Sequence, residues 1–353
     1  MPARATRKRR SSNAVTIHEV ARRAGVSPMT VSRVTHGVEN VRDATREVVL
    51  KAIRELNYSP NPAAQSLAGA RNTRIALIYS NPSVAYLSEL LLGALEKASR
   101  TAAQLVVEKW DDFKPAMERA AARRLSQNVA GVILPPPLCE SVAISSELAS
   151  ADIPVVAVAT GRARADVCCV RIDDFRAASE MTGYLVSLGH ARIGFIKGHP
   201  NQTASAQRFA GFKAACETAG LAVNPAHVEQ GYFTYRSGLE AAERLLGRKR
   251  APTAIFASND DMAAAVISVA HRGGLDVPRD LSVVGFDDTL TATTVWPELT
   301  TIRQPIATMA DAALALLLRQ IRDKRAGLEL EPVDHLFAHE LVKRDSAAPP
   351  RAG

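Results

Sequence analysis

The feature that most constrains this chain is the alternation of short apolar runs and helical patterns over about 270 residues. Runs such as residues 75–79, 131–134 and 254–257 are bounded by turn residues and are typical of strands buried on both faces. Helical patterns follow, as at residues 87–98 and 177–188. Such an alternation predicts doubly wound parallel sheets, and its length predicts two lobes. The same patterns predict strands at residues 104–108, 154–158, 168–172, 193–196 and 281–286, and a helix at 117–125.

The positive charge of the chain is concentrated at one end. The whole sequence carries +8 at pH 7, with 44 Lys and Arg against 36 Asp and Glu. Residues 1–74 hold 14 of the basic residues and only 5 of the acidic ones, so the remainder is close to neutral. A basic segment joined to a neutral body indicates a module that binds a polyanion. For residues 1–14 alone, a disordered basic tail is the preferred interpretation.

Residues 15–58 have an apolar periodicity that a disordered tail lacks. Thr16 and Glu19 form the pattern of a capping box, and Gly25 is suited to end the helix that follows. A second helix is predicted from Ser27, as N-cap, to about Thr35. A third is predicted over residues 44–57. The expected inward residues of the second and third helices are Val31, Val34, Val48, Val49, Ala52, Ile53 and Leu56.

Two short helices about a tight turn, closed by a third, predict a helix-turn-helix. In that motif the N-terminal end of the second helix enters the major groove of DNA. The exposed residues there are Pro28, Met29, Thr30, Ser32 and Arg33. Arg33 can bond a guanine edge or a phosphate, whereas Met29 offers only an apolar contact. A three-helix protein-interaction module is the alternative, which the local charge disfavours.

Residues 16–34 (TIHEVARRAGVSPMTVSRV) and 56–69 (LNYSPNPAAQSLAG) resemble the headpiece of the LacI/GalR transcription regulators. This resemblance implies further DNA-contacting residues in and after the headpiece. They are Thr16, Ser27, His36, Asn40, Asn61, Ala64 and Leu67.

The pattern of residues 61–69 predicts a short helical segment between domains. It is too short to be a stable helix alone in water, so ordering on binding is expected. The resemblance implies that two such hinges pair in the minor groove, where Leu67 opens the central base step. A plain linker, with Leu67 packed on the core, is the alternative that the pattern alone favours.

The resemblance extends through residues 187–196, 208–212, 258–263, 281–288 and 299–305. In the family, this core is similar to periplasmic sugar-binding proteins, with two lobes, three crossings and a ligand in the cleft. The expected fold class is therefore an all-α helix-turn-helix headpiece plus a two-lobed, periplasmic-binding-protein-like α/β core. The expected ranges are a tail at 1–14, a DNA-binding domain at 15–60, a hinge at 61–73, a core at 74–346 and a tail at 347–353. Within the core, they are a first lobe at about 74–173 and 305–332 and a second lobe at about 174–304 and 333–346.

Ligands of parallel α/β sheets bind at the carboxyl ends of the strands. Asn81, Asn259 and Asp287 follow predicted strands, as do Asp260 and Asp288, for which helix capping is a competing role. The resemblance implies that the effector is bound by Arg208, Asn259, Asp287, a stacking Phe233 and Asn81, with Tyr86 and Gln304 as further candidates. Residues 81–86, 159–161 and 198–208 depart from the commoner family pattern, so a sugar or sugar derivative is expected without its identity.

Motifs of other function classes are missing from the sequence. Neither a dinucleotide fingerprint after the first strand, nor a P-loop, nor a nucleophile elbow is present. His335 and His339 lie in a strand-like run, where a solvated strand edge is favoured over a metal site. We therefore expect no enzyme activity, no cofactor and no metal. The four cysteines lack zinc-ligand spacing and are expected to be free buried thiols: Cys139, Cys168, Cys169 and Cys216.

The sequence contains no apolar run of about 18 residues and no apolar segment after the basic N-terminus, so neither a membrane span nor a secretory signal is expected. The expected protein is a cytoplasmic, nucleoid-associated bacterial homodimer that represses carbohydrate-metabolism genes from a pseudo-palindromic operator. A dimer is favoured over a tetramer because no C-terminal leucine heptad is present. The alternatives are control by a non-sugar metabolite or a partner protein and, more distantly, a sugar-binding transport protein or an enzyme.

Overall fold

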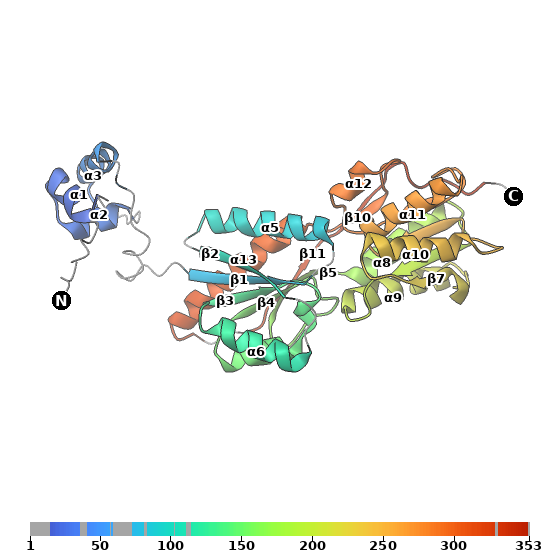
Figure 1. Ribbon diagram of the computed structural model, residues 1–353, viewed down its shortest axis with the longest axis horizontal. Coiled ribbons are helices and arrows are strands. Elements are labelled where there is room, and N and C mark those ends of the chain that lie inside the picture. The colour runs from blue at the N-terminus through green and yellow to red at the C-terminus, as the bar shows by residue number, and fades with distance from the viewer. Residues whose placement is uncertain are drawn as a thin grey trace, which may run out of the picture. The chain divides into compact units, whose positions relative to one another are not determined.

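The computed structural model describes residues 15–35, 41–56, 58, 73–80, 83–101, 103–110, 114–328 and 331–351. The chain divides into two units, Met1–Asn72 and Thr73–Gly353, and each is described by itself (Figure 1). The expected hinge, residues 61–73, falls outside the described ranges except for Thr73, which begins the first strand of the core.

The first unit contains the three predicted helices, α1 (Ile17–Ala24), α2 (Pro28–Thr35) and α3 (Asp43–Glu55). They enclose a small apolar core made of Val20, Ala21, Val31, Val34, Val49 and Ala52. The prediction that Val48 is buried is wrong, because its side chain is 49% exposed. Neighbouring residues of a helix point about 100° apart, and the adjacent Val49 takes the inward position.

The second unit begins with a six-stranded parallel sheet of order β11-β5-β4-β3-β1-β2. Its strands are β1 (Thr73–Tyr79), β2 (Ala103–Lys109), β3 (Gly131–Leu134), β4 (Val155–Val158), β5 (Cys168–Ile172) and β11 (Asp334–Phe337). Successive strand residues enter different cores, as with Ile133 and Val132. Both faces of this sheet are therefore covered, as the apolar runs predicted.

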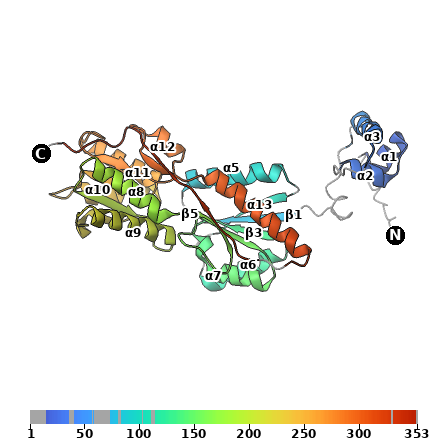
Figure 2. The same ribbon diagram turned by 180° about the vertical axis from the view of Figure 1, so that it is seen from behind.

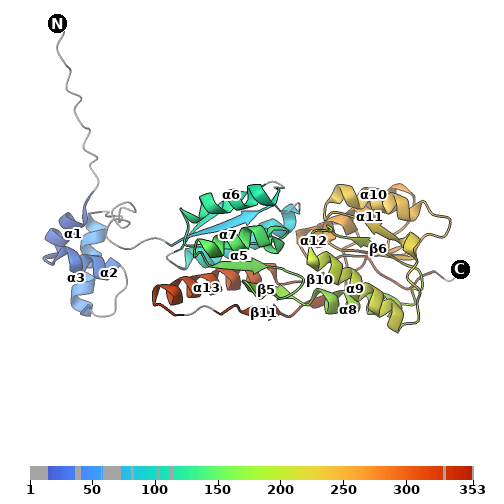
Figure 3. The same cartoon turned by 90° about the horizontal axis from the view of Figure 1, so that it is seen from below.

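Helices α5 (Val84–Ser99) and α13 (Ile306–Arg325) pack together on one face of this sheet. Helices α6 (Pro115–Ser126) and α7 (Val142–Ser150) cover the other face (Figure 3). A short 3-10 helix, η1 (Leu138–Glu140), precedes α7. These elements form the first lobe.

The second lobe is built on a four-stranded parallel sheet of order β7-β6-β8-β9. Its strands are β6 (Ile193–Lys197), β7 (Val228–Gln230), β8 (Ala254–Ala257) and β9 (Ser282–Val284). Helices α8 (Asp174–Ser187) and α9 (Thr203–Thr218) pack together, as do α10 (Tyr235–Leu246) and α11 (Asp260–Arg272) (Figure 2). The remaining short helices are η2 (Pro225–His227) and α12 (Leu290–Thr294).

The chain passes between the lobes three times. The first two passages run from β5 to α8 and from β10 (Thr301–Arg303) to α13. The third lies later than expected. β11 pairs in parallel with β5 of the first sheet, and the next strand, β12 (Glu340–Val342), pairs antiparallel with β10. Residues 334–337 thus belong to the first lobe, where Asp334 accepts two hydrogen bonds from Arg171.

The prediction of a tail after residue 346 is wrong for residues 347–351. Ser346 is buried, and the residues that follow it form a segment that packs on the second lobe. The N–H of Ala348 donates to the hydroxyl of Ser282, and its carbonyl contacts the ring of His190. The Pro/Ala composition suggested a tail, but backbone groups, which composition does not describe, make these contacts.

Candidate functional site

The first candidate site lies at the N-terminal end of α2. Ser27 caps this helix, since its Oγ accepts a hydrogen bond from the N–H of Thr30 at 3.1 Å. Met29 is 64% exposed and Arg33 is exposed, whereas Val31 and Val34 point into the headpiece core. The arrangement presents the predicted DNA-facing side chains on one surface. Pro28, Thr30 and Ser32 of the same helix are partly exposed.

The preceding helix, α1, begins and ends at the residues that the sequence indicated. The N–H of Thr16 donates to the carboxylate of Glu19 at 2.6 Å, and this bond lowers the pKa of Glu19. Gly25 ends α1 with φ +67°, a left-handed conformation that favours glycine. The other predicted DNA-contacting residues lie outside the described residues: His36, Asn40, Asn61, Ala64 and Leu67.

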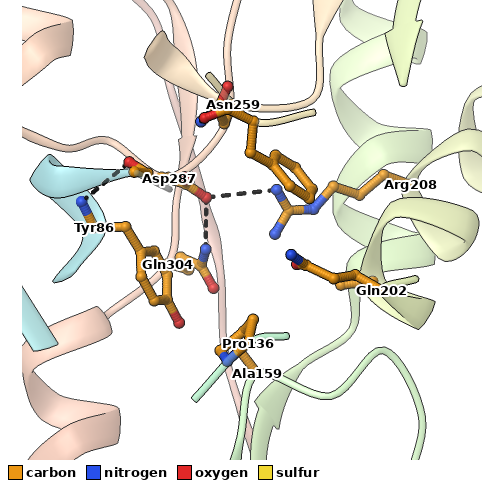
Figure 4. Close-up of a pocket in the computed structure, with 11 residues that line it drawn as sticks. Tyr86, Pro136, Ala159, Gln202, Arg208, Asn259, Asp287 and Gln304 are labelled. Atoms are coloured by element: carbon orange, nitrogen blue, oxygen red, sulfur yellow. Dashed lines mark hydrogen bonds and ion pairs between the residues drawn. The ribbon is translucent and has the colours of Figure 1, made fainter. Parts of the chain in front are cut away.

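The second candidate site is a cavity between the two lobes of the core (Figure 4). It contains about 340 Å³ of space, part of it open to solvent, and its walls follow the carboxyl ends of β3, β4, β8 and β9. The lining residues are Ser83, Tyr86, Pro136, Ala159, Gln202, Ala204, Arg208, Phe233, Asn259, Asp287 and Gln304. Six of the seven predicted effector residues are among them, and the seventh, Asn81, lies outside the described residues.

Arg208 is the cation of this cavity and is 5% exposed. Its Nε donates to Asp174 at 2.8 Å and its Nη1 donates to the carbonyl of Ser258 at 2.6 Å. Nη1 also lies 3.5 Å from Oδ1 of Asp287, and the guanidinium covers the ring of Phe286 at 3.6 Å. These four contacts hold the side chain in place before any ligand binds.

Asp287 faces Arg208 from the loop after β9. Its backbone has φ +111°, and its Oδ1 accepts a hydrogen bond from Nε2 of Gln304 at 2.6 Å. Burial raises the pKa of Asp287 to about 7, while the charge of Arg208 and the hydrogen bond from Gln304 oppose that rise. The carboxyl group is therefore poised between its charged and neutral forms near neutral pH.

Phe233 supplies the aromatic wall that the resemblance implied. Its backbone has φ +60°, and its ring lies against Gly198 so closely that a Cβ there would be 1.9 Å from Cζ. Glycine at position 198 thus makes room for the ring.

Asn259 lines the cavity but is already engaged on both ends of its amide. Its Oδ1 caps α11 by accepting from the N–H of Met262, and its Nδ2 donates to the carbonyl of Phe233. Asp260, for which capping was a competing role, is not the cap. It is buried and accepts hydrogen bonds from Thr289 and Thr301.

Asp288 is not among the lining residues and belongs to an ion-pair network. Its carboxylate lies 2.7 Å from Arg303 and 2.7 Å from Arg344. These contacts tie β9, β10 and the C-terminal segment together, so the role of this residue is structural, although it is not the helix cap that the sequence suggested.

Two buried polar atoms of the cavity residues have no hydrogen-bond partner within the described ranges. They are the hydroxyl of Tyr86 and Oε1 of Gln304. Burial, followed by the charge of Asp287, raises the pKa of Tyr86 well above its usual value, so this hydroxyl stays protonated. Buried polar groups are normally paired, and these two atoms therefore point to a ligand that carries complementary groups.

Five of the lining residues were not predicted from the sequence: Ser83, Pro136, Ala159, Gln202 and Ala204. Pro136 and Ala159 follow the first-lobe strands β3 and β4, so the carboxyl-end rule could have indicated them. Gln202 stands directly before α9, within the stretch 198–208 that departs from the commoner family pattern.

Potential metal ligands do not gather in the part of the chain that the structure describes. No group of three or more His, Cys, Asp or Glu there is arranged to hold a metal ion. His335 is exposed on β11, whereas His339 lies beyond the end of that strand and contacts Glu180 at 3.0 Å, so the two do not share a strand face. All four cysteines are free and buried, as predicted. None of the described helices is long and apolar enough to cross a lipid bilayer.

Two segments of the chain match known protein families. The family described as "Bacterial regulatory proteins, lacI family" matches residues 16–61. The "Periplasmic binding protein-like domain" matches residues 182–347.

Similarity to individual proteins covers almost the whole chain. The HTH-type transcriptional regulator DegA of Bacillus subtilis (strain 168) is 36% identical over 337 residues, which are 95% of this chain and 98% of DegA. A structure of the Lac repressor dimer bound to operator and the anti-inducer ONPF has a TM-score of 0.77 and 29% identity, covering 95% and 100% of the two chains. The complex of the regulator CelR with cellobiose has a TM-score of 0.71 and 31% identity, covering 94% and 99%.

Proposed function

The chain belongs to the lacI family of bacterial regulatory proteins, and we propose that it is a repressor whose affinity for its operator is set by a sugar or sugar derivative in the core cavity. As a member of this family it is a DNA-binding transcriptional regulator. The observation that carries the proposal is the gathering of Arg208, Asp287 and Phe233, with two unpaired polar atoms, around one cavity between lobes.

The surface of α2 supports the DNA-binding part of the proposal. Arg33 and Met29 are exposed beside a capped N-terminus, which suits insertion into a major groove. A two-fold dimer reads a two-fold operator, and the Lac repressor structure is itself a dimer on operator. We infer that this chain acts as a homodimer on a pseudo-palindromic site.

The cavity supports the effector part. A sugar offers hydroxyls to carboxylates, amides and guanidinium groups and an apolar face to an aromatic ring, and all of these line the cavity. The related CelR binds cellobiose. Binding between the lobes would favour one arrangement of the lobes over another, and DNA affinity would follow that difference.

The test is operator selection from random genomic fragments, followed by fluorescence anisotropy with and without a panel of sugars that includes cellobiose. We expect one fragment class to bind well above the salt-sensitive background and a particular sugar to change that affinity. Loss of binding with the sugar would make it an inducer, and a gain would make it a corepressor. Selection that yields only salt-sensitive background binding would contradict the proposal. If the chain binds an operator but no sugar alters that binding, control by a non-sugar metabolite or a partner protein would follow instead.

Two variants separate specific from non-specific binding. Arg33→Ala should weaken binding to the selected operator by roughly tenfold or more. The matched control is Arg236→Ala, an exposed arginine of the core, which should leave it unchanged. Leu67→Ala should weaken specific binding much more than non-specific binding, and equal losses would contradict the wedge role.

A further inference from the structure

The charge of the cavity is already decided by its own side chains. Arg208 is the single cation among the lining residues that the structure describes, and it contacts two carboxylates, Asp174 at 2.8 Å and Asp287 at 3.5 Å. Both carboxylates are buried, at 2% and 5% exposure. The charge of Arg208 thus has one carboxylate partner in Asp174 and a second in Asp287 whenever that group is ionised.

An anionic ligand would find no uncommitted positive charge here. A phosphate or carboxylate beside Arg208 would also stand beside Asp287, and like charges in a buried site oppose each other strongly. Two more carboxyl groups lie behind the wall, and burial, followed by the charge of Asp287, raises the pKa of Asp260 well above its usual value. Asp261 accepts a hydrogen bond from Ser83, and Asp260 accepts one from Thr301.

Two positions in the cavity wall call for a hydrogen-bond donor from the ligand. Oε1 of Gln304 is an acceptor without a partner in the described structure, and Asp287 is an acceptor whenever it is ionised. An anionic phosphate or carboxylate group brings mainly acceptors, whereas a hydroxyl group brings both a donor and an acceptor. The hydroxyl of Tyr86, which stays protonated, can pair with such a group in either sense.

Figure 4 shows how these groups face one another. The amide of Gln304 and the guanidinium of Arg208 flank Asp287, and Gln202 approaches from the opposite side. Pro136 and Ala159 add an apolar floor. Phe233 is also among the lining residues and adds an aromatic ring.

We propose that the effector is an uncharged, hydroxyl-rich molecule, and that the pair Asp174 and Asp287 excludes the phosphorylated or carboxylated counterpart. This inference rests on the proposed function, since it assigns the chemical class of the effector in that same cavity. Asp174 acts from behind the wall, as a residue that offsets the charge of Arg208.

The experiment compares matched ligand pairs on the full-length protein by isothermal titration calorimetry. The pairs are glucose and glucose 6-phosphate, galactose and galactose 1-phosphate, fructose and fructose 6-phosphate, and ribose and ribose 5-phosphate, with gluconate and the uncharged base hypoxanthine added. We expect one neutral sugar to bind and its phosphate to bind at least about fiftyfold more weakly.

Asp174→Asn tests the cause of that discrimination. The asparagine keeps an oxygen that can accept from Nε of Arg208 but leaves the arginine with one carboxylate instead of two. We expect the preference for the neutral member to fall at least tenfold. Glu147→Gln is the matched control, because it neutralises a carboxylate paired with Arg123 on the surface of the first lobe, and it should leave the preference unchanged.

The outcomes distinguish this inference from the proposed function. A phosphorylated sugar that binds more tightly than its neutral partner would overturn the inference and leave sugar control intact. Unchanged discrimination in Asp174→Asn, in a variant with wild-type thermal unfolding, would overturn the role of the carboxylate pair. Binding of hypoxanthine alone would overturn both the hydroxyl-rich effector and sugar control, while operator binding would remain to be judged by the selection experiment.

Discussion

The raised pKa of Asp287 predicts that ligand binding depends on pH. Its pKa is raised to about 7 by burial, against the opposing charge of Arg208. A sugar hydroxyl that donates to this carboxylate favours the ionised form. We therefore expect effector affinity to rise between about pH 6 and pH 8 and to level off above, and the Asp287→Asn variant to bind weakly with no such rise. Calorimetric titrations at three pH values would check this, and a flat wild-type profile would contradict it.

The same carboxyl group affects stability with the opposite sign. In the unfolded chain its pKa is near 3.8, whereas in the folded protein it is about 7. Between these values the folded state holds a proton that the unfolded state has released, so this group's contribution to the free energy of unfolding falls as pH rises from about 4 to about 7. Urea unfolding of the wild type and Asp287→Asn at about pH 5 and pH 8 should show the variant gaining relative stability at the higher pH.

Gly198 tests the aromatic wall without changing any polar group. A Cβ at this position would lie 1.9 Å from the ring of Phe233, so the ring would have to move. We expect Gly198→Ala to weaken effector binding by tenfold or more while operator binding without effector is retained. Gly183→Ala is the control, because a Cβ there meets open space in α8. Equal effector affinity in both variants would show that Phe233 does not form the ligand wall.

Helix α1 depends on a glycine that the sequence placed at its end. Gly25 has φ +67°, and a Cβ added there would meet no atom within 4 Å, so an alanine suffers only the backbone penalty of about 1 kcal/mol. We expect Gly25→Ala to reduce amide-exchange protection in the headpiece by roughly fivefold. Gly220→Ala makes the same change after α9 of the core, at φ +69° and in equally open space, and should leave headpiece protection unchanged. Hydrogen exchange with mass spectrometry reports both.

Helix α9 begins at a contact between the lobes. Glu140 of the first lobe accepts hydrogen bonds from the hydroxyl and, at 3.2 Å, the N–H of Thr203 at the start of α9. The same hydroxyl accepts from the N–H of Gly161 at 2.9 Å. The first lobe therefore satisfies an N-terminal N–H of this helix, which the helix itself cannot do.

Loss of that contact should lower the population of the arrangement in which the lobes meet. Since apparent affinity falls with the fraction of competent protein, we expect Thr203→Ala to weaken effector binding severalfold although Thr203 does not line the cavity. Thr218→Ala at the other end of α9 is the control, because its hydroxyl bonds only within the helix in the described structure. Calorimetry measures the effector affinity of the two variants, and equal affinities would rule out a role for the contact in lobe closure.

For the molecule as a whole, local patterns were enough to predict the alternating strands and helices. The apolar runs of β3, β4 and β8 are buried on both faces, as predicted, because residues of opposite parity enter separate cores. The helix N-caps at Thr16 and Ser27 were equally predictable, since a cap involves residues only three positions apart. The headpiece, whose elements are adjacent in sequence, was therefore almost fully predictable.

The composition of the cavity depends on contacts that no local pattern records. Ser83 bonds to Asp261, 178 positions away, and Glu140 bonds to Thr203, 63 positions away. The fold also decides the roles of adjacent residues, since Asn259 caps α11 whereas Asp260 accepts a hydrogen bond from Thr301. Strand β11 joins the first sheet although it follows the second lobe in sequence. Sequence order specifies what each segment can form, but the roles of buried polar groups follow from partners that meet only when the lobes are assembled.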